Sequence, residues 1–287
     1  MWVLDFRHDA LTPIFKALSF SGDSTFFLLV FTVGYWIVDR RIFARATLML
    51  LVAVLANSVL KAVFQIPRPD AAFFLIEAHG WSFPSGHAMV AGAVWPWLAL
   101  ESKRRWALPV AALLALAVAA SRVYLGVHTL LDVSVGLALG ALLILPARAW
   151  AASPPPPWQR AGVGAQTLLL GVLAAVFLSV APIYQDDTVG AQAAGALVAL
   201  WLGLAWDRKQ GHALPIGAAR KVAAAVLGLA GTFGLRVLLK GPLAALPLSL
   251  AWSDAIRYGC VGLWIAAGAT ACFYALGLAR PDPESLG

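Results

Sequence analysis

Charged residues are scarce in this 287-residue chain, at 12% of the sequence, whereas hydrophobic residues make up 61% of it. A soluble domain typically holds about 25% charged and about 45–50% apolar residues. The shortage of charge therefore excludes an ordinary soluble domain, and the apolar content excludes a disordered chain. The remaining class is an all-α, polytopic integral membrane protein, in which a bundle of helices crosses the bilayer.

Cysteine is nearly absent as well, since the chain has only Cys260 and Cys272, both in one apolar stretch. Helical geometry would separate them by about 18 Å, which is far beyond the reach of a disulfide, so a disulfide scaffold is excluded. Acidic residues are also few, 14 against 21 lysines and arginines, and the formal net charge is +7. In a membrane protein this excess indicates basic cytoplasmic loops rather than binding to nucleic acid.

A transmembrane helix needs about 20 mostly apolar residues, and about nine stretches of the sequence meet this requirement. They lie near 24–38, 44–64, 84–101, 107–122, 129–147, 166–184, 189–206, 219–239 and 256–279. Residues 9–20 are amphipathic instead, which predicts a helix that lies in the membrane interface before the chain turns inward.

Basic residues divide unevenly between the two sides that these spans define. One set of alternate loops holds 13 lysines and arginines, and the other set holds 8. The positive-inside rule places the richer set in the cytoplasm, with the N-terminus outside and the C-terminus inside. Because four consecutive prolines cannot continue a helix, residues 150–165 form a cytoplasmic linker. It separates an interfacial helix and five spans (1–149) from four further spans (166–287) of unknown role.

Two of the outward-facing loops are unusually polar for their position. Their ionisable residues include Lys61, Arg68 and His87 in and after the first loop, and Arg122, His128 and Asp132 around the second. Ionisable groups in or near membrane spans are costly and are therefore functional candidates. Three cations, two histidines and one aspartate are thus predicted to meet at one face of the membrane.

The cations predict a binding site for a tetrahedral oxyanion such as phosphate, because arginine suits bidentate contact with phosphate oxygens. Pro84 is a good first residue for a helix, which would place Ser85, Gly86 and His87 in its first turn. Unpaired backbone N–H groups and the helix dipole favour an anion at that position. Gly86 would let the anion approach the backbone closely.

His128 and Asp132 are four residues apart, a spacing that puts both side chains on one face of a helix. A carboxylate bonded to one imidazole nitrogen fixes the tautomer and leaves the other nitrogen free to attack. His87, on a different span, could protonate the leaving group. The pattern favours covalent phosphoryl transfer through a phosphohistidine.

Three blocks of the sequence resemble the three signature motifs of the type 2 phosphatidic acid phosphatase (PAP2) superfamily. The blocks are Lys61-x6-Arg68-Pro69, Pro84-Ser85-Gly86-His87 and Ser121-Arg122-x5-His128-x3-Asp132. Every signature position is filled, and the resemblance covers residues 61 to 132. It implies a catalytic core within residues 1–149. Nine spans with an outer N-terminus are also similar to the glucose-6-phosphatases of this superfamily.

The resemblance implies a role for each signature residue. His128 would be the nucleophile, Asp132 would orient it, and His87 would be the general acid. The phosphate would be bound by Lys61, Arg68, Arg122, Ser85 and Gly86, and Ser121 would help to hold that site. No metal and no other cofactor is implied, and the surrounding ring of cations opposes metal binding by the His128–Asp132 pair.

We therefore expect a metal-independent phosphatase that hydrolyses a phosphate monoester or diphosphate of a lipid on the extracytoplasmic side of a bacterial inner membrane. The expected substrates are phosphatidic acid, phosphatidylglycerol phosphate or an isoprenyl diphosphate. The expected partners are this lipid and the bilayer, without nucleic acid, and the sequence leaves a homo-oligomer open. Alternatives are hydrolysis of a soluble sugar phosphate, phosphate transfer to a lipid acceptor, or a non-enzymatic lipid flippase or transporter.

Overall fold

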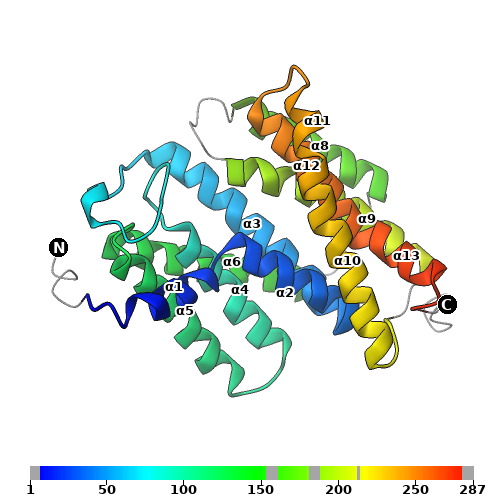
Figure 1. Ribbon diagram of the computed structural model, residues 1–287, viewed down its shortest axis with the longest axis horizontal. Helices are drawn as coiled ribbons and strands as arrows, with labels where there is room; N and C mark the ends of the chain where they lie inside the picture. Colours follow the sequence, from blue (N-terminus) through cyan, green and yellow to red (C-terminus); the bar gives the residue numbers. More distant parts are fainter. Residues whose placement is uncertain (1–6, 153–160, 181–187, 212–213, 280–287) are drawn as a thin grey trace. The chain divides into compact units, whose positions relative to one another are not determined.

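The computed structural model describes residues 7–152, 161–180, 188–211 and 214–279 (Figure 1). Every regular element in these ranges is a helix, so the all-helical fold class is confirmed. Seven helical segments are long and apolar enough to cross a membrane: Arg40–Phe64, Ala107–Tyr124, Leu130–Ala149, Val163–Val180, Thr188–Gln210, Ala218–Ala244 and Leu250–Ala275.

The predicted count of nine spans is not confirmed by these helices. Two predicted spans form shorter helices, because α2 (Ser24–Ile37) has 14 residues and α4 (Gly86–Glu101) has 16. They rise about 21 and about 24 Å, less than the hydrocarbon core of about 30 Å. Residues 9–20, the predicted interfacial helix, contain α1 (Thr12–Phe20). Together α1 and α2 form a pair bent by 51° that would count as an eighth span.

The other elements follow the predicted order. They are α3 (Arg40–Phe64), η2 (Ala71–Phe73), α5 (Ala107–Tyr124), α6 (Leu130–Ala152), α8 (Val163–Val180), α9 (Thr188–Gln210), α10 (Ala218–Leu238), α11 (Lys240–Ala244), α12 (Leu250–Leu263), η4 (Trp264–Gly268) and α13 (Ala269–Ala275). The last span begins before its predicted start at 256, because the Ser249 side chain accepts from the backbone N–H of Trp252 and caps α12.

Two compact units divide the chain. Unit 1 comprises Met1–Leu28 and Ala46–Ser153, and unit 2 comprises Leu29–Arg45 and Pro154–Gly287. Residues 29–45, which the sequence places in the N-terminal half, therefore pack with the C-terminal unit. Residues 153–160 of the predicted linker lie outside the described part of the chain.

In unit 1, α4 packs against α5 and α6, and α1 packs against α5. The contact between α4 and α6 is very close, because a Cβ at Gly140 would lie 2.1 Å from the carbonyl oxygen of Met89. Only glycine fits at such a contact between helix backbones. This packing sets the N-terminal end of α4 beside the first turn of α6, where the N–H of Ser85 donates to the carbonyl of Asp132 at 3.0 Å.

The loop between α3 and α4 in unit 1, residues 65–85, is bonded to the end of α5 through an arginine near the N-terminus. The guanidinium of Arg7 donates to the carbonyl of Phe73 in the loop at 2.7 Å and to the carbonyl of Tyr124 at 3.1 Å. Phe15 of α1 stacks on the Tyr124 ring with 4.0 Å between centroids. These contacts fix the loop that carries part of the candidate site.

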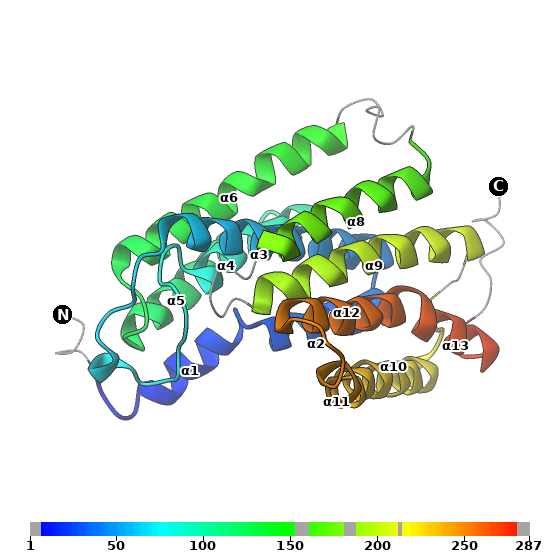
Figure 2. The same cartoon turned by 90° about the horizontal axis from the view of Figure 1, so that it is seen from above.

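In unit 2, α9 lies between α8 and α12 (Figure 2). The end of α2, the turn that follows it and the start of α3 are held by side chains with polar groups that hydropathy alone would not place inside. Trp36 is fully buried and its indole N–H donates to the carbonyl of Ile265 at 2.8 Å. The Tyr35 hydroxyl donates to Asp207 at 2.9 Å, and Arg40 pairs with the same carboxylate. These bonds join the turn to α9 and η4.

The close α4–α6 contact leads us to predict that a larger residue at position 140 lowers the stability of the fold. Replacing Gly140 by alanine places a methyl group against the Met89 carbonyl, and such overpacking costs about 1–3 kcal/mol. The matched control is Gly171→Ala in α8, where a Cβ would meet nothing within 4 Å. We expect thermal unfolding in detergent, followed by tryptophan fluorescence, to show a lower Tm for Gly140→Ala only. An unchanged Tm for Gly140→Ala would contradict this packing.

Candidate active site

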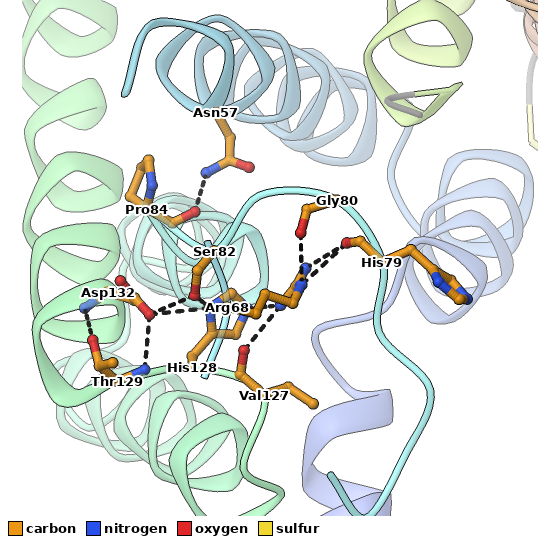
Figure 3. Close-up of polar contacts among 10 residues, drawn as sticks. All are labelled: Asn57, Arg68, His79, Gly80, Ser82, Pro84, Val127, His128, Thr129 and Asp132. Atoms are coloured by element: carbon orange, nitrogen blue, oxygen red, sulfur yellow. Dashed lines mark hydrogen bonds and ion pairs between the residues drawn. The ribbon is translucent and has the colours of Figure 1, made fainter. Parts of the chain in front are cut away.

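His128 lies in the loop between α5 and α6 and is only 2% exposed. Its ring nitrogens face different partners (Figure 3). Nε2 lies 3.2 Å from Nη1 of Arg68, while Nδ1 lies 3.2 Å from Oγ of Ser82 and 3.5 Å from Oδ2 of Asp132. Because arginine can only donate, Nε2 carries the lone pair and the proton sits on Nδ1.

Asp132 is fixed on the first turn of α6 by three hydrogen bonds. Its Oδ2 accepts from the Ser82 hydroxyl and from the backbone N–H of Thr129, both at 2.7 Å. Its own N–H donates to the Thr129 hydroxyl at 3.2 Å. The structure thus brings together Asp132 and His128, as their spacing predicts, and adds Ser82 between them (Figure 3).

The guanidinium of Arg68 is held beside His128 by main-chain carbonyl groups. Nε donates to the carbonyls of His79 and Gly80, each at 3.1 Å, and Nη2 donates to that of His79 at 2.9 Å. Nη1 donates to the carbonyl of Val127 at 3.0 Å. Arg68 is therefore oriented in advance by the two loops that carry the site.

The His128 ring is neutral at physiological pH. Burial is the main cause that lowers the pKa of His128 from 6.5 to about 3, and the nearby carboxylate of Asp132 opposes this change. Positive charges lower the pKa further, and they come from the three predicted phosphate-binding cations: Arg68, Arg122 and Lys61. Their joint effect shows that these cations lie around one histidine.

The Pro84-Ser85-Gly86-His87 block forms the start of α4, although the helix begins at Gly86 with Ser85 as N-cap rather than at Pro84. The N–H of Ser85 donates to the Asp132 carbonyl, so the hydroxyl of Ser85 is the group that remains for a ligand. Ser85 Oγ is buried and has no hydrogen-bond partner among the described residues.

The Asn57 side chain of α3 lies close to Gly86. A Cβ at Gly86 would lie 2.9 Å from Oδ1 of Asn57 on α3. Asn57 also donates from Nδ2 to the carbonyl of Pro84 at 3.0 Å, which anchors the turn before α4. A side chain at position 86 would therefore press on the Asn57 amide that anchors this turn.

Arg122 is 5% exposed near the end of α5. Its Nη1 donates to the hydroxyl of Ser19 on α1 at 2.6 Å, and its Nε is buried without a partner in the described ranges. Ser121, beside it, donates its hydroxyl to the Val118 carbonyl at 2.6 Å within α5. The structure therefore does not turn the Ser121 hydroxyl toward the other predicted site residues.

His87 and Lys61 are the two predicted site residues that remain to be placed. Lys61 lies in the last turn of α3, and His87 follows Gly86 in the first turn of α4. The His87 side chain makes no hydrogen bond to another described residue. The turn between α1 and α2 lies against it, because a Cβ at Gly22 would be 3.3 Å from His87 Cδ2.

Three contacts of the candidate site were not predicted from the sequence. They are those of Ser19, Ser82 and Thr129. Serine and threonine occur throughout loops and helix ends, and their spacing here carries no chemical signal. Within the described ranges, no group of three or more His, Cys, Asp and Glu side chains could hold a metal ion.

Comparisons with known proteins assign the family. Residues 42–153 match the PAP2 superfamily, and residues 191–281 match the PAP2 superfamily phosphatase transmembrane extension. The chain is 36% identical over 150 residues to phosphatidylglycerophosphatase B of Bacillus subtilis, which covers 48% of this chain and 73% of that protein. It is 29% identical over 144 residues to human sphingosine-1-phosphate phosphatase 2, covering 46% of this chain and 36% of that protein.

Solved structures that resemble the chain include a transmembrane PAP2-type phosphatidylglycerolphosphate phosphatase from Bacillus subtilis. It is 29% identical, with a TM-score of 0.47 over 52% of this chain and 80% of that one. Another is LpxE of Aquifex aeolicus, which is 22% identical with a TM-score of 0.46 over 52% of this chain and 91% of that one.

The sequence matches and the apolar helices define an integral membrane enzyme that hydrolyses phosphoric esters. The chain belongs to the PAP2 superfamily, which confirms the resemblance seen in its three motifs.

From the low pKa of His128 we predict that its ring stays neutral in mildly acidic solution. Folded His128, with a pKa of about 3, stays neutral at pH 5, whereas an unfolded histidine with a pKa of 6.5 is mostly protonated there. Acidification from pH 7 to pH 4 therefore favours unfolding through this group. We expect the ring ¹⁵N resonances, assigned by comparison with His128→Gln, to remain those of a neutral Nδ1–H tautomer at pH 5. A cationic ring at that pH would contradict the burial described above.

Proposed function

We propose that this chain is a metal-independent lipid phosphate phosphatase that works through a phosphohistidine on His128. The observation that carries the proposal is the orientation of the neutral His128 ring, whose Nε2 lone pair faces Arg68 while Nδ1–H is backed by Ser82 and Asp132. The names of its relatives support a lipid substrate, because they describe phosphatases of phosphatidylglycerophosphate and sphingosine-1-phosphate.

The proposed phosphate site lies between His128 and the start of α4. Arg68 and Arg122 would each donate to phosphate oxygens, and Lys61 would add a third positive charge. Two buried groups support this placement, since Ser85 Oγ and Arg122 Nε lack partners among the described residues. An unpaired buried donor costs about 1–3 kcal/mol. A phosphate oxygen accepting from each of them would remove that cost.

The proposed reaction has two in-line steps. In the first, Nε2 of His128 attacks phosphorus, the bond to the leaving oxygen breaks, and His87 gives that oxygen a proton. In the second, His87 takes a proton from water, the hydroxide attacks phosphorus, and the P–N bond breaks to release phosphate and neutral His128. The cations stabilise charge on the transferring group throughout, which is commonly the largest catalytic effect.

The proposed site faces the extracytoplasmic side of a bacterial inner membrane, with a catalytic core in residues 1–149. This orientation rests on the distribution of lysine and arginine between the loops. A site at the membrane surface favours an amphiphile whose tail stays in the bilayer. Phosphatidic acid, phosphatidylglycerol phosphate and isoprenyl diphosphates are the substrates that fit this description.

The first test is phosphate release by the purified full-length chain in detergent with EDTA. We expect turnover of one of these lipids, and we expect His128→Gln to lower kcat by about 10³-fold or more because the nucleophile is lost. Loss of activity in EDTA with recovery in Mg²⁺ would contradict the mechanism. Turnover of glucose 6-phosphate alone would replace the lipid by a sugar phosphate, and headgroup binding without turnover would favour a transporter.

The second test uses orthovanadate, which resembles the trigonal-bipyramidal transition state. We expect it to inhibit the enzyme, and we expect Arg122→Lys to weaken inhibition by about tenfold or more. A lysine cannot replace the planar guanidinium fork or its Nε donor. The control is Arg220→Lys, which makes the same change at an exposed position at the start of α10. Equal vanadate inhibition in Arg122→Lys and the control would remove Arg122 from the phosphate site.

A further inference from the structure

Ser82 lies between His128 and Asp132, a position that no signature motif includes. Its Oγ is 3.2 Å from Nδ1 of His128 and 2.7 Å from Oδ2 of Asp132. The direct distance from Nδ1 to Oδ2 is 3.5 Å. Hydrogen bonds between nitrogen and oxygen are typically about 2.7–3.2 Å long. The shorter route from the carboxylate to the ring therefore passes through the serine hydroxyl.

The direction of each hydrogen bond along this route is fixed by its neighbours. Arg68 donates to Nε2, so the single ring proton is on Nδ1. The ionised carboxylate of Asp132 can only accept, so the Ser82 hydroxyl proton points to it. The remaining lone pairs of Ser82 Oγ face Nδ1–H. One consistent chain results, from His128 to Ser82 and from Ser82 to Asp132 (Figure 3).

The backbone holds Ser82 in this place independently of its side chain. Ser82 is 1% exposed, and its N–H donates to the carbonyl of Ile66 at 2.8 Å. Ile66 lies two residues before Arg68, so the same loop positions both the serine and the guanidinium. The hydroxyl and the arginine thus reach His128 from one loop, at opposite ring nitrogens.

We propose that Ser82 is a positioning residue that transmits the support of Asp132 to His128, an inference that rests on the phosphohistidine mechanism proposed above. When Nε2 bonds to phosphorus, the ring gains positive charge and keeps its Nδ1 proton. Ser82 accepts from that N–H more strongly as the charge develops, and Asp132 stabilises the polarised hydroxyl. No proton leaves the ring in this step, and Ser82 itself makes no covalent bond.

The test is a double-mutant cycle with Ser82→Ala and Asp132→Asn, measured with the lipid substrate that the full-length enzyme hydrolyses. We expect Ser82→Ala to lower kcat by about 10- to 100-fold, the usual effect of losing a hydrogen bond to a group that becomes charged. KM and vanadate inhibition should stay within about threefold, because the phosphate clamp is intact. The double variant should be little worse than Asp132→Asn, since both changes break one chain.

A second readout separates positioning from general damage to the fold. Arg68 keeps the proton on Nδ1 in both the wild type and Ser82→Ala, but the Nδ1–H proton resonance of His128 should move upfield in Ser82→Ala because the hydroxyl that accepts from it is lost. Ser82→Thr, which keeps the hydroxyl, should restore both kcat and the downfield resonance relative to alanine. An unchanged Nδ1–H resonance in Ser82→Ala would overturn the inference, as would a wild-type kcat.

The control His128→Gln distinguishes the two proposals. If His128→Gln is inactive while Ser82→Ala keeps the wild-type kcat, the phosphohistidine mechanism stands and the role of Ser82 is wrong. If His128→Gln keeps its activity, the mechanism fails and the role of Ser82 fails with it. A loss of kcat in Ser82→Ala that simply adds to that of Asp132→Asn would show that the carboxylate acts on the ring directly.

Discussion

The candidate site depends on the close contact between α4 and α6. Glycine at position 140 lets the α6 backbone approach the carbonyl of Met89, and the Ser85 N–H closes on the Asp132 carbonyl at the end of this contact. His87 on one side and His128 with Asp132 on the other belong to the segments that meet at this contact. If these helices moved apart by even about 1 Å, His87 would be displaced relative to His128. A displacement of about 1 Å between reacting groups can lower an enzyme's rate by about 10²-fold.

A second constraint is the cost of placing three cations around one neutral histidine. Burying a charge is unfavourable unless it is paired or hydrogen-bonded. Main-chain carbonyls of His79, Gly80 and Val127 meet this requirement for Arg68, and the hydroxyl of Ser19 meets part of it for Arg122. The carbonyls and the hydroxyl orient the guanidinium groups without neutralising them, so the site keeps its positive charge.

The sequence predicts the parts of this architecture that depend on residue type and local spacing. Helices follow from long apolar runs, and the proximity of His128 and Asp132 follows from their four-residue spacing. Lys61, Arg68 and Arg122 stand out because a charge is conspicuous among apolar residues. The structure brings these residues around His128, although it turns the Ser121 hydroxyl back onto its own helix.

The rest could not be predicted, because it depends on contacts between distant segments. The contact of Gly86 with Asn57, which lies 29 residues earlier on α3, is an example. Residues 29–45 pack with unit 2 through hydrogen bonds of Tyr35 and Trp36 to partners more than 170 residues away, which no hydropathy pattern contains.

The pairing of His128 with Asp132 shows where the limit of such prediction lies. The spacing places both groups on one side of the chain, yet His128 precedes α6 and its Nδ1 stops 3.5 Å from the carboxylate. A gap of this size weakens a direct hydrogen bond and leaves room for a bridging hydroxyl. Ser82 fills it from a loop 46 residues earlier. Residue type and spacing therefore predict the reacting groups, and the long-range fold supplies the group that connects them.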